Sequence, residues 1–189
     1  MSKFLLLLGV SGVGKSSVIE ELFRLDSKFV YISPYMTRPL REGEKSKISI
    51  SDPEMDEMWA QGELLVINKL YGIRYATPRV PIVEALAAGK YPVLDWPISR
   101  IQIMTEAFPD QLYSVYLSPP SMEALRQRLA KDGRDTDGSR LKSALDELEA
   151  CRSSKYNGLY DFEIVNEDGQ ALQVASAIYA NYLKSFQQA

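Results

Sequence analysis

Residues 9–16 read Gly-Val-Ser-Gly-Val-Gly-Lys-Ser and match the phosphate-binding loop pattern G-x-x-x-x-G-K-[ST]. The apolar run Phe4–Leu8 leads directly into this loop and predicts a buried parallel strand. The amphipathic segment Ser16–Leu25 leads out of it and predicts a helix. A strand, a glycine loop and a helix in this order predict an α/β fold, in which helices cover a parallel sheet.

The glycine loop has the chemistry of an anion site. Glycines let successive backbone N–H groups turn inward, and the following helix directs its positive end to the same point. Lys15 supplies a cation for the terminal phosphates, and the hydroxyl of Ser16 is placed to hold a phosphate-bound Mg²⁺. The residues expected to bind the phosphates are Gly9, Val10, Ser11, Gly12, Val13, Gly14, Lys15, Ser16 and Ser17.

The composition excludes several other classes of protein. The 189 residues suit a single domain, and a formal net charge of −3 gives no basic surface for nucleic acid or for a membrane. The chain has no His, so it has neither a histidine base nor a His metal site. Its one cysteine, Cys151, fits a reducing compartment, and the N-terminal apolar run is too short to span a membrane. We therefore expect a cytoplasmic protein. The sequence leaves the oligomeric state open between a monomer and a homodimer.

Apolar runs alternate with helical segments along most of the chain. The predicted strands are Phe4–Leu8, Phe29–Ile32, Tyr91–Leu94, Leu112–Leu117 and Phe162–Val165. The predicted helices are Ser16–Leu25, Pro81–Ala88, Ile98–Phe108, Ser121–Lys131, Arg140–Lys155 and Gln170–Phe186. This alternation predicts a parallel sheet with helices on both faces.

Two segments interrupt the alternation. Residues 34–80 begin as a polar stretch and then contain a short helix, Met55–Trp59, and a strand, Leu64–Lys69. They predict a lobe inserted into a core formed by residues 1–33 and 81–189. Residues 132–139 are charged and glycine-rich and lie between two helices, so they form either an ordinary surface turn or a lid over the phosphate site.

Arginines are the next candidates, because phosphoryl transfer needs cations around the moving group. Arg38 and Arg41 are three residues apart, and Pro39 stiffens the segment between them. Two guanidinium forks can grip one phosphate, although a solvated charged turn would have the same sequence.

A second group of arginines surrounds the predicted lid. Arg134 and Arg140 are candidates for stabilising transition-state charge when the lid closes, and Arg128 is a further candidate for the nucleotide. Arg126 is better explained by salt bridges on a helix surface.

Two polar residues follow predicted strands. Asp95 comes directly after Val93-Leu94, at an edge of a parallel sheet that faces the ligand. It can hold Mg²⁺ directly or through water, or it can cap a helix. Asn166 ends the strand Phe162–Val165 and can contact a base or cap a turn.

With these residues in place, the chain resembles the guanylate kinases along nearly its whole length. The matching stretches are Gly9–Ser16, Thr37-Arg38-Pro39-x-Arg41-x-Gly43-Glu44, Gly62-Glu63-Leu64, Tyr75 with Thr77, Ala88-Gly89-Lys90, Val93-Leu94-Asp95, Pro119-Pro120-Ser121, Arg128-Leu129, Arg140-Leu141 and Ile164-Val165-Asn166. The resemblance implies a core, a monophosphate-binding lobe and a lid. It implies ATP on the phosphate loop with adenine near Asn166, and an acceptor phosphate gripped by Arg38, Arg41 and Tyr75.

The chain departs from this family where the guanine base is read. The Ser, Glu and second Asp that the family uses there fall on Pro34, Val66 and Pro97, with Ser33 one place away from the first. A phosphate-gripping Tyr of the family falls near Lys47, and one arginine of the lid falls on Asp132. A site that lacks partners for the polar edge of a base should bind that base weakly.

Three functions remain open on the sequence. The first is ATP-dependent phosphorylation of a nucleoside monophosphate, with GMP or dGMP as the family's acceptor. The second is the same chemistry on ribose 1,5-bisphosphate, because Pro97-Ile98-Ser99-Arg100 resembles a Ser-Arg stretch in kinases of that substrate. The third is a non-catalytic binding module, against which the intact Lys15 and Ser16 count.

Overall fold

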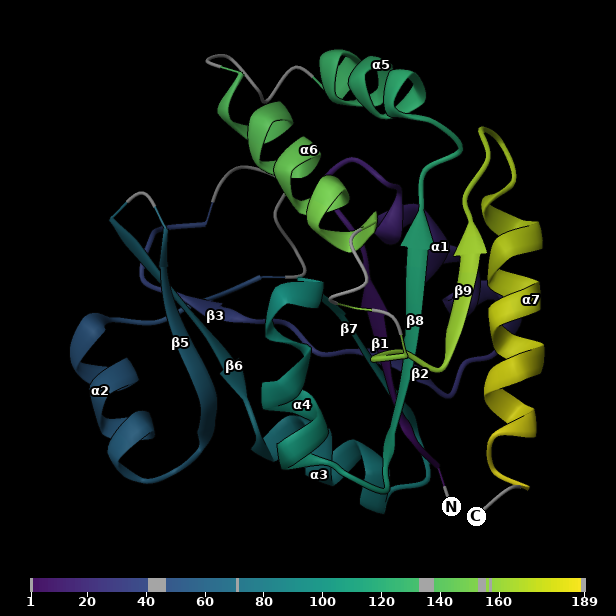
Figure 1. Ribbon diagram of the computed structural model, residues 1–189. Helices are drawn as coiled ribbons and strands as arrows, with labels where there is room; N and C mark the ends of the chain where they lie inside the picture. Colours follow the sequence, from purple (N-terminus) through teal and green to yellow (C-terminus); the bar gives the residue numbers. More distant parts are fainter. Residues whose placement is uncertain are drawn as a thin grey trace.

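The chain folds around two sheets, one in a core and one in a smaller lobe (Figure 1). The computed structural model describes residues 2–40, 47–70, 72–132, 138–152, 156 and 158–187. The core sheet has five strands in the order β2-β7-β1-β8-β9, and the lobe sheet has four strands in the order β4-β3-β6-β5. The predicted α/β fold with a parallel sheet and covering helices is confirmed.

Every strand pair in the core sheet is parallel. Its strands are β1 (Phe4–Leu8), β2 (Phe29–Tyr31), β7 (Tyr91–Trp96), β8 (Leu112–Ser118) and β9 (Phe162–Val165). All five residues of β1 are buried, as expected for a central strand that is covered on both faces. The loop that follows β1 therefore leaves the middle of the sheet at its carboxyl edge, where ligands of open parallel sheets bind.

Helices cover both faces of the core sheet and its carboxyl edge (Figure 1). They are α1 (Lys15–Leu25), α3 (Val80–Ala87), the short 3₁₀ helix η1 (Ile98–Arg100), α4 (Ile101–Ala107), α5 (Met122–Asp132), α6 (Ser139–Arg152) and α7 (Ala171–Lys184). Helices α1 and α7 bury their apolar sides against one face, and α3 and α4 against the other. Helix α6 reaches over the carboxyl edge and contributes to both apolar clusters.

The lobe lies to one side of the core sheet and carries its own small apolar cluster (Figure 1). Its elements are β3 (Tyr35–Met36), β4 (Ile48–Ser49), α2 (Asp52–Ala60), β5 (Leu64–Leu70) and β6 (Ile73–Pro78). Met55 of α2, Leu64 and Ala76 form the buried centre of this cluster. These elements fall inside the range that the sequence predicts for the lobe.

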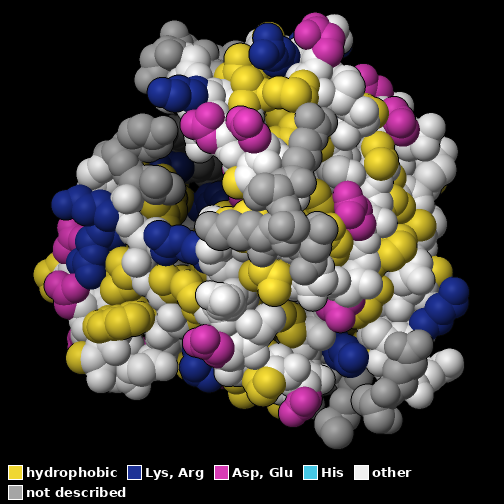
Figure 2. Space-filling view, in the orientation of Figure 1, with side chains coloured by type: hydrophobic (Ala, Val, Ile, Leu, Met, Phe, Trp, Pro, Cys, Tyr) yellow, Lys and Arg dark blue, Asp and Glu magenta, His cyan; other side chains and the backbone are white. Residues whose placement is uncertain are grey.

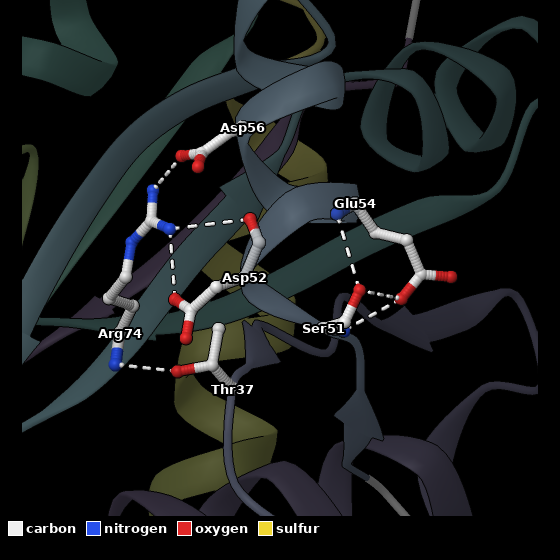
Figure 3. A network of polar contacts seen from close by, with 6 residues as sticks. All are labelled: Thr37, Ser51, Asp52, Glu54, Asp56 and Arg74. Carbon is white, nitrogen blue, oxygen red and sulfur yellow. Dashed lines mark hydrogen bonds and ion pairs between the residues drawn. The ribbon is translucent and has the colours of Figure 1, made fainter.

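Polar contacts at the surface hold α2 against the lobe sheet (Figure 3). Arg74 of β6 forms ion pairs with Asp52 at 2.9 Å and with Asp56 at 2.5 Å. Ser51 and Glu54 form a capping box, in which the Ser51 hydroxyl accepts from the Glu54 N–H and the Glu54 carboxylate accepts from the Ser51 N–H. The capping box fixes where α2 begins, and the ion pairs from Arg74 connect α2 to β6 of the lobe sheet.

The predicted elements of the core agree with the observed ones, apart from their ends. Strand β7 continues through Asp95 to Trp96, so Asp95 lies within the strand and does not cap a helix. The predicted helix Ile98–Phe108 begins as the 3₁₀ turn η1, which follows the extended residue Pro97. Strands β3, β4 and β6 of the lobe are not among the predicted elements.

In the part of the chain that the structure describes, no helix is both long and apolar enough to cross a membrane.

Candidate active site

The phosphate loop follows β1 and requires glycine where its backbone turns most sharply. Gly9 has a φ of 141°, and a Cβ at this position would lie 2.6 Å from the backbone oxygen of Leu117. Gly14 has a φ of 100°, and a Cβ there would collide with the side-chain amide of Asn166. The backbone conformation and the close packing together explain why the loop carries glycine at both positions.

Helix α1 begins directly after the loop and has an open N-terminus. Its first residue is Lys15, and Gly14 stands at the N-cap position without a side chain to accept a hydrogen bond. Among the described residues no side chain caps the first turn, and this turn contains no acidic residue. The first N–H groups of α1 and the positive end of its dipole are therefore available to an anion.

Lys15 lies folded against its own loop. Its Nζ donates to the backbone oxygen of Gly9 at 2.6 Å and to that of Val10 at 3.1 Å. Burial lowers the pKa of Lys15, while the negative charges of Asp95 and Glu147 act in the opposite direction. A cation that is already desolvated and aligned interacts strongly with a phosphate that enters the site.

Asp95 reaches the same site from the neighbouring strand. It is in register with Leu7 of β1, two residues before the loop begins. The Tyr31 hydroxyl, from β2, donates to Oδ1 of Asp95 at 2.7 Å and so fixes the direction of the carboxylate. Burial, followed by the nearby Asp95 charge, raises the pKa of Tyr31, so this phenol keeps its proton and remains a donor.

The donors fit a Mg²⁺ ion that is bound together with phosphates. In the described part of the chain no three His, Cys, Asp or Glu side chains gather as a metal cage. The Ser16 hydroxyl and the Asp95 carboxylate lie on the wall of one cavity, and Mg²⁺ prefers such a sparse oxygen set when a nucleotide supplies the remaining ligands.

Arg128 and Asn166 brace the loop from its other side. The Asn166 Nδ2 donates to the backbone oxygen of Val13 at 2.8 Å, and Arg128 donates to the same oxygen at 3.2 Å. Arg128 also donates to the backbone oxygen of Asn166 at 2.7 Å and forms an ion pair with Asp168. In this structure the carboxamide of Asn166 therefore faces the phosphate loop.

Helix α6 carries two charged residues over the loop. Arg140 donates to the Ser11 hydroxyl at 3.0 Å and forms an ion pair with Asp132 at 2.9 Å. Glu147, two turns further along α6, adds its charge to the surroundings of Lys15. Burial raises the pKa of Glu147, and the positive charge of Lys15 opposes this shift.

One cavity of about 790 Å³ joins most of these groups. Figure 2 shows the surface hollowed between the lobe and the core, with Lys and Arg side chains around the hollow. The predicted site residues that line the cavity are Ser11, Gly12, Gly14, Lys15, Ser16, Ser17, Asp95, Arg128, Arg140 and Asn166. Lys47, the residue immediately before β4, also lines the cavity. Its Nζ lies 5.8 Å from the centre of the Tyr31 ring.

Two of the predicted acceptor residues, Arg38 and Tyr75, lie apart from the loop, in the lobe. Tyr75 of β6 is in register with Met36 of β3. Arg38 lies two residues after Met36 in the chain. The Arg38 guanidinium donates to the backbone oxygen of Pro39 at 2.8 Å. Neither side chain lines the cavity of the phosphate loop. Two predicted residues, Arg41 and Arg134, lie outside the described residues, as does most of the predicted lid.

Sequence reasoning missed three residues of the site. Tyr31 stands at the carboxyl end of a predicted strand, and a polar side chain at that edge was the available signal. Glu147 lies seven residues after Arg140 and therefore on the same face of one helix. Asp132 was identified only as the place of a missing arginine, yet it is the ion-pair partner of Arg140.

Comparisons with known proteins agree with this geometry. A sequence model of the guanylate kinase family matches residues 1–180. A guanylate kinase of Nitrosomonas europaea is 33% identical over 194 residues, covering 100% of this chain and 94% of the relative. A guanylate kinase of a Nostoc species is 32% identical over 175 residues, covering 89% of this chain and 84% of the relative. The crystal structure of a guanylate kinase from Anaplasma phagocytophilum superposes with a TM-score of 0.71 at 25% identity, covering 97% of this chain and 85% of that one.

These matches do not favour the two alternatives that the sequence leaves open. The relatives that we compared carry the name of an enzyme, guanylate kinase, and not that of a ribose bisphosphate kinase or a binding module.

Proposed function

The chain belongs to the guanylate kinase family, and on this premise we propose that it transfers the γ-phosphoryl group of ATP to GMP or dGMP. The observation that carries the proposal is the single cavity in which the phosphate loop, the half-buried Lys15 and the carboxylate of Asp95 meet two arginines. A scaffold protein has no use for a desolvated lysine at an uncapped helix N-terminus, whereas phosphoryl transfer depends on such a group.

ATP is held by the loop between β1 and α1. The open first turn of α1 binds the phosphates, and Lys15 moves from the oxygens of Gly9 and Val10 to the phosphate oxygens. Arg128 and Asn166 stiffen the loop. We propose that the adenine lies near Asn166. The first step is thus an exchange of backbone partners for phosphate partners at Lys15.

Ser16 and Asp95 would hold the magnesium ion that accompanies ATP. When bound, this ion neutralises charge on the β- and γ-phosphates. The hydrogen bond from Tyr31 keeps one oxygen of Asp95 occupied and directs the other toward the site.

The acceptor is held in the lobe. Arg38, Arg41 and Tyr75 grip its phosphate, because forked guanidinium donors and a phenol match phosphate oxygens. An oxygen of this phosphate attacks the γ-phosphorus of ATP, the bond from that phosphorus to the oxygen of ADP breaks, and GDP and ADP are formed. Lys15, Arg134 and Arg140 stabilise the charge that spreads over the transferred group.

The test is ADP formation with ATP and Mg²⁺ against GMP, dGMP, AMP, CMP, UMP and ribose 1,5-bisphosphate. We expect turnover with GMP and dGMP, and loss of that turnover in the Lys15→Met variant. Selective turnover of ribose 1,5-bisphosphate would reject the acceptor. If none of the six acceptors were turned over while ATP still bound, the proposed reaction would be wrong.

A further inference from the structure

A hydrogen bond joins the lobe to the core beside the acceptor site. Arg100, the last residue of η1, donates from Nη1 to Oδ1 of Asn68 in β5. Arg100 is exposed and Asn68 is half-buried, so neither side chain is needed to fill the core. Helix α4, which continues from η1, contacts β5 in the same region.

The strand register places Asn68 on the same face of the lobe sheet as Tyr75, the residue proposed to grip the acceptor phosphate. Asn68 is directly opposite Tyr75, and Val66 is directly opposite Thr77, so these four residues share one face of the sheet. Ile67 and Ala76 lie on the other face, where they pack with α2. The side chain of Asn68 therefore stands beside Tyr75, on the face turned away from α2.

A guanine base needs both donors and acceptors from its site. Its O6 and N7 accept hydrogen bonds, while its N1–H and 2-amino group donate them. Pro34, Val66 and Pro97 offer no side-chain hydrogen bonds, so these positions cannot read the base. Asn68 carries an acceptor and a donor on one carboxamide, and Arg100 carries a fork of donors.

We infer that Asn68 and Arg100 together read the guanine of the acceptor nucleotide. The Arg100 fork donates to O6 and N7, and Oδ1 of Asn68, which accepts from Arg100 in this structure, accepts from the N1–H edge of the base. The hydrogen bond between the two side chains holds both in place before the base arrives. This inference rests on the proposed function, since it assumes that the acceptor phosphate lies near Tyr75 and the base lies along the same face.

Two other roles would use the same contact. Arg100 and Asn68 could serve only to hold the lobe against the core, or Arg100 could bind a second phosphate, as a ribose bisphosphate would require. These roles differ from base reading in one measurable respect. A strut or a phosphate ligand affects all nucleoside monophosphates equally, whereas a base reader changes the preference among them.

The experiment measures equilibrium binding of GMP, IMP and AMP by calorimetry. The proteins are the wild type, Arg100→Ala, Arg100→Lys, Asn68→Ala and the double alanine variant. AMP carries a 6-amino group in place of O6 and has no N1–H, whereas IMP lacks only the 2-amino group. We expect each alanine variant to lose about 10- to 100-fold of the preference for GMP over AMP, while its affinity for AMP changes little.

The further variants distinguish a guanidinium that donates two hydrogen bonds to the base from a side chain that supplies only a positive charge. Arg100→Lys keeps the charge but loses the fork, so it should resemble Arg100→Ala in its preference for GMP. The double variant should lose less than the sum of the two single losses, because the two side chains act as a unit. Lys90→Ala removes an exposed charge just before β7 and serves as the matched control, with no change expected.

Three results would overturn the inference. Arg100→Ala could lose affinity for GMP and AMP equally, or the wild type could show no preference for GMP over AMP. The third result is that binding of ribose 1,5-bisphosphate depends on Arg100 while binding of GMP does not. Failure of the proposed function has a different signature. In that case the wild type would bind GMP with a preference that depends on Arg100 and would form no GDP from it.

Discussion

The phosphate loop and the acceptor lobe are built in opposite ways. The loop is held by buried or half-buried contacts from several distant elements: Leu117 of β8, Arg128 of α5, Arg140 of α6 and Asn166 after β9. The lobe depends on a small apolar cluster and on ion pairs whose carboxylates are more than half exposed.

This difference means that the phosphate loop and the lobe should differ in how well they tolerate substitutions. A loop fixed by the core tolerates little change, because each contact is shared with the packing of the sheet. A lobe held by surface contacts can replace the residues on its inner face without loss of the fold. The resemblance of the sequence to the guanylate kinases predicts this pattern, since the loop is intact while Pro34 and Val66 are expected at positions where the family reads guanine.

The largest effect is expected at the loop. Lys15→Met should lower kcat by about 10³-fold or more, because the charge on the transferred group loses its nearest cation. Burial lowers the pKa of Lys15, so at neutral pH its charge opposes folding, and the Tm of the variant should stay the same or rise. Steady-state kinetics and calorimetry test both parts. A fall in both kcat and Tm would mean that Lys15 supports the fold as well as the reaction, which would contradict the expected effect on Tm.

The next effect concerns the brace of the loop. Asn166→Ala removes the buried hydrogen bond to the oxygen of Val13, which still accepts from Arg128, so we expect a loss of about 0.5–1.5 kcal/mol in the free energy of unfolding. The KM for ATP should rise while the KM for the acceptor stays near its original value, since the contact lies wholly on the core side. Urea denaturation and initial rates would show this. An increase in the KM for the acceptor alone would contradict the assignment.

A smaller effect on stability is expected in the lobe. Arg74→Met breaks the exposed ion pairs with Asp52 and Asp56, and the Tm should fall by no more than about 3 °C. Because these pairs connect α2 to β6 of the lobe sheet, the KM for GMP should rise while the KM for ATP does not. Thermal unfolding followed with and without GMP measures both quantities. A large loss of Tm would mean that the lobe is as tightly coupled to the core as the loop is.

The smallest effect lies at the far end of α1, where Tyr179 donates to Asp26 at 2.6 Å. Burial alone would raise the pKa of Asp26, but the hydrogen bonds from Tyr179 and the Lys28 N–H outweigh it, and the pKa is lowered. A carboxyl with a lowered pKa in the folded protein stabilises it at neutral pH, and this contribution is lost as the pH falls through the folded pKa, below about pH 4. Tyr179→Phe should therefore lower the Tm by about 2 °C or less at pH 7 and by still less at pH 3. A difference that grew at low pH would refute the assignment.

The core could be predicted from the sequence because its signals are local. Continuous apolar runs such as Phe4–Leu8 identify buried strands, and the glycine loop identifies the edge at which the ligand binds. Strands β3 and β4 have only two residues each, too few for any periodicity to emerge. The start of α2 carried a usable signal, the Ser51 and Glu54 capping box, which places the helix three residues earlier than predicted.

The contacts within the site were harder to predict from the sequence. Lys15, Asp95, Arg140 and Asn166 could be selected because their residue types and positions suit phosphate chemistry. Their partners could not, because the contacts from Tyr31 to Asp95 and from Arg128 to Val13 join residues 64 and 115 positions apart. Such pairs depend on the order of strands in the sheet, which the alternation of elements leaves open.

The uncapped start of α1 has a consequence for the life of the protein in a cell. A helix that leaves its first N–H groups without a side-chain cap is completed by whatever anion occupies the loop. The nucleotide thereby becomes a structural part of the fold, and at 100 times its Kd it adds about 2.7 kcal/mol to stability. The resistance of the protein to heat and to proteases would then depend on the nucleotide concentration. Depletion of the nucleotide would therefore speed the degradation of the protein.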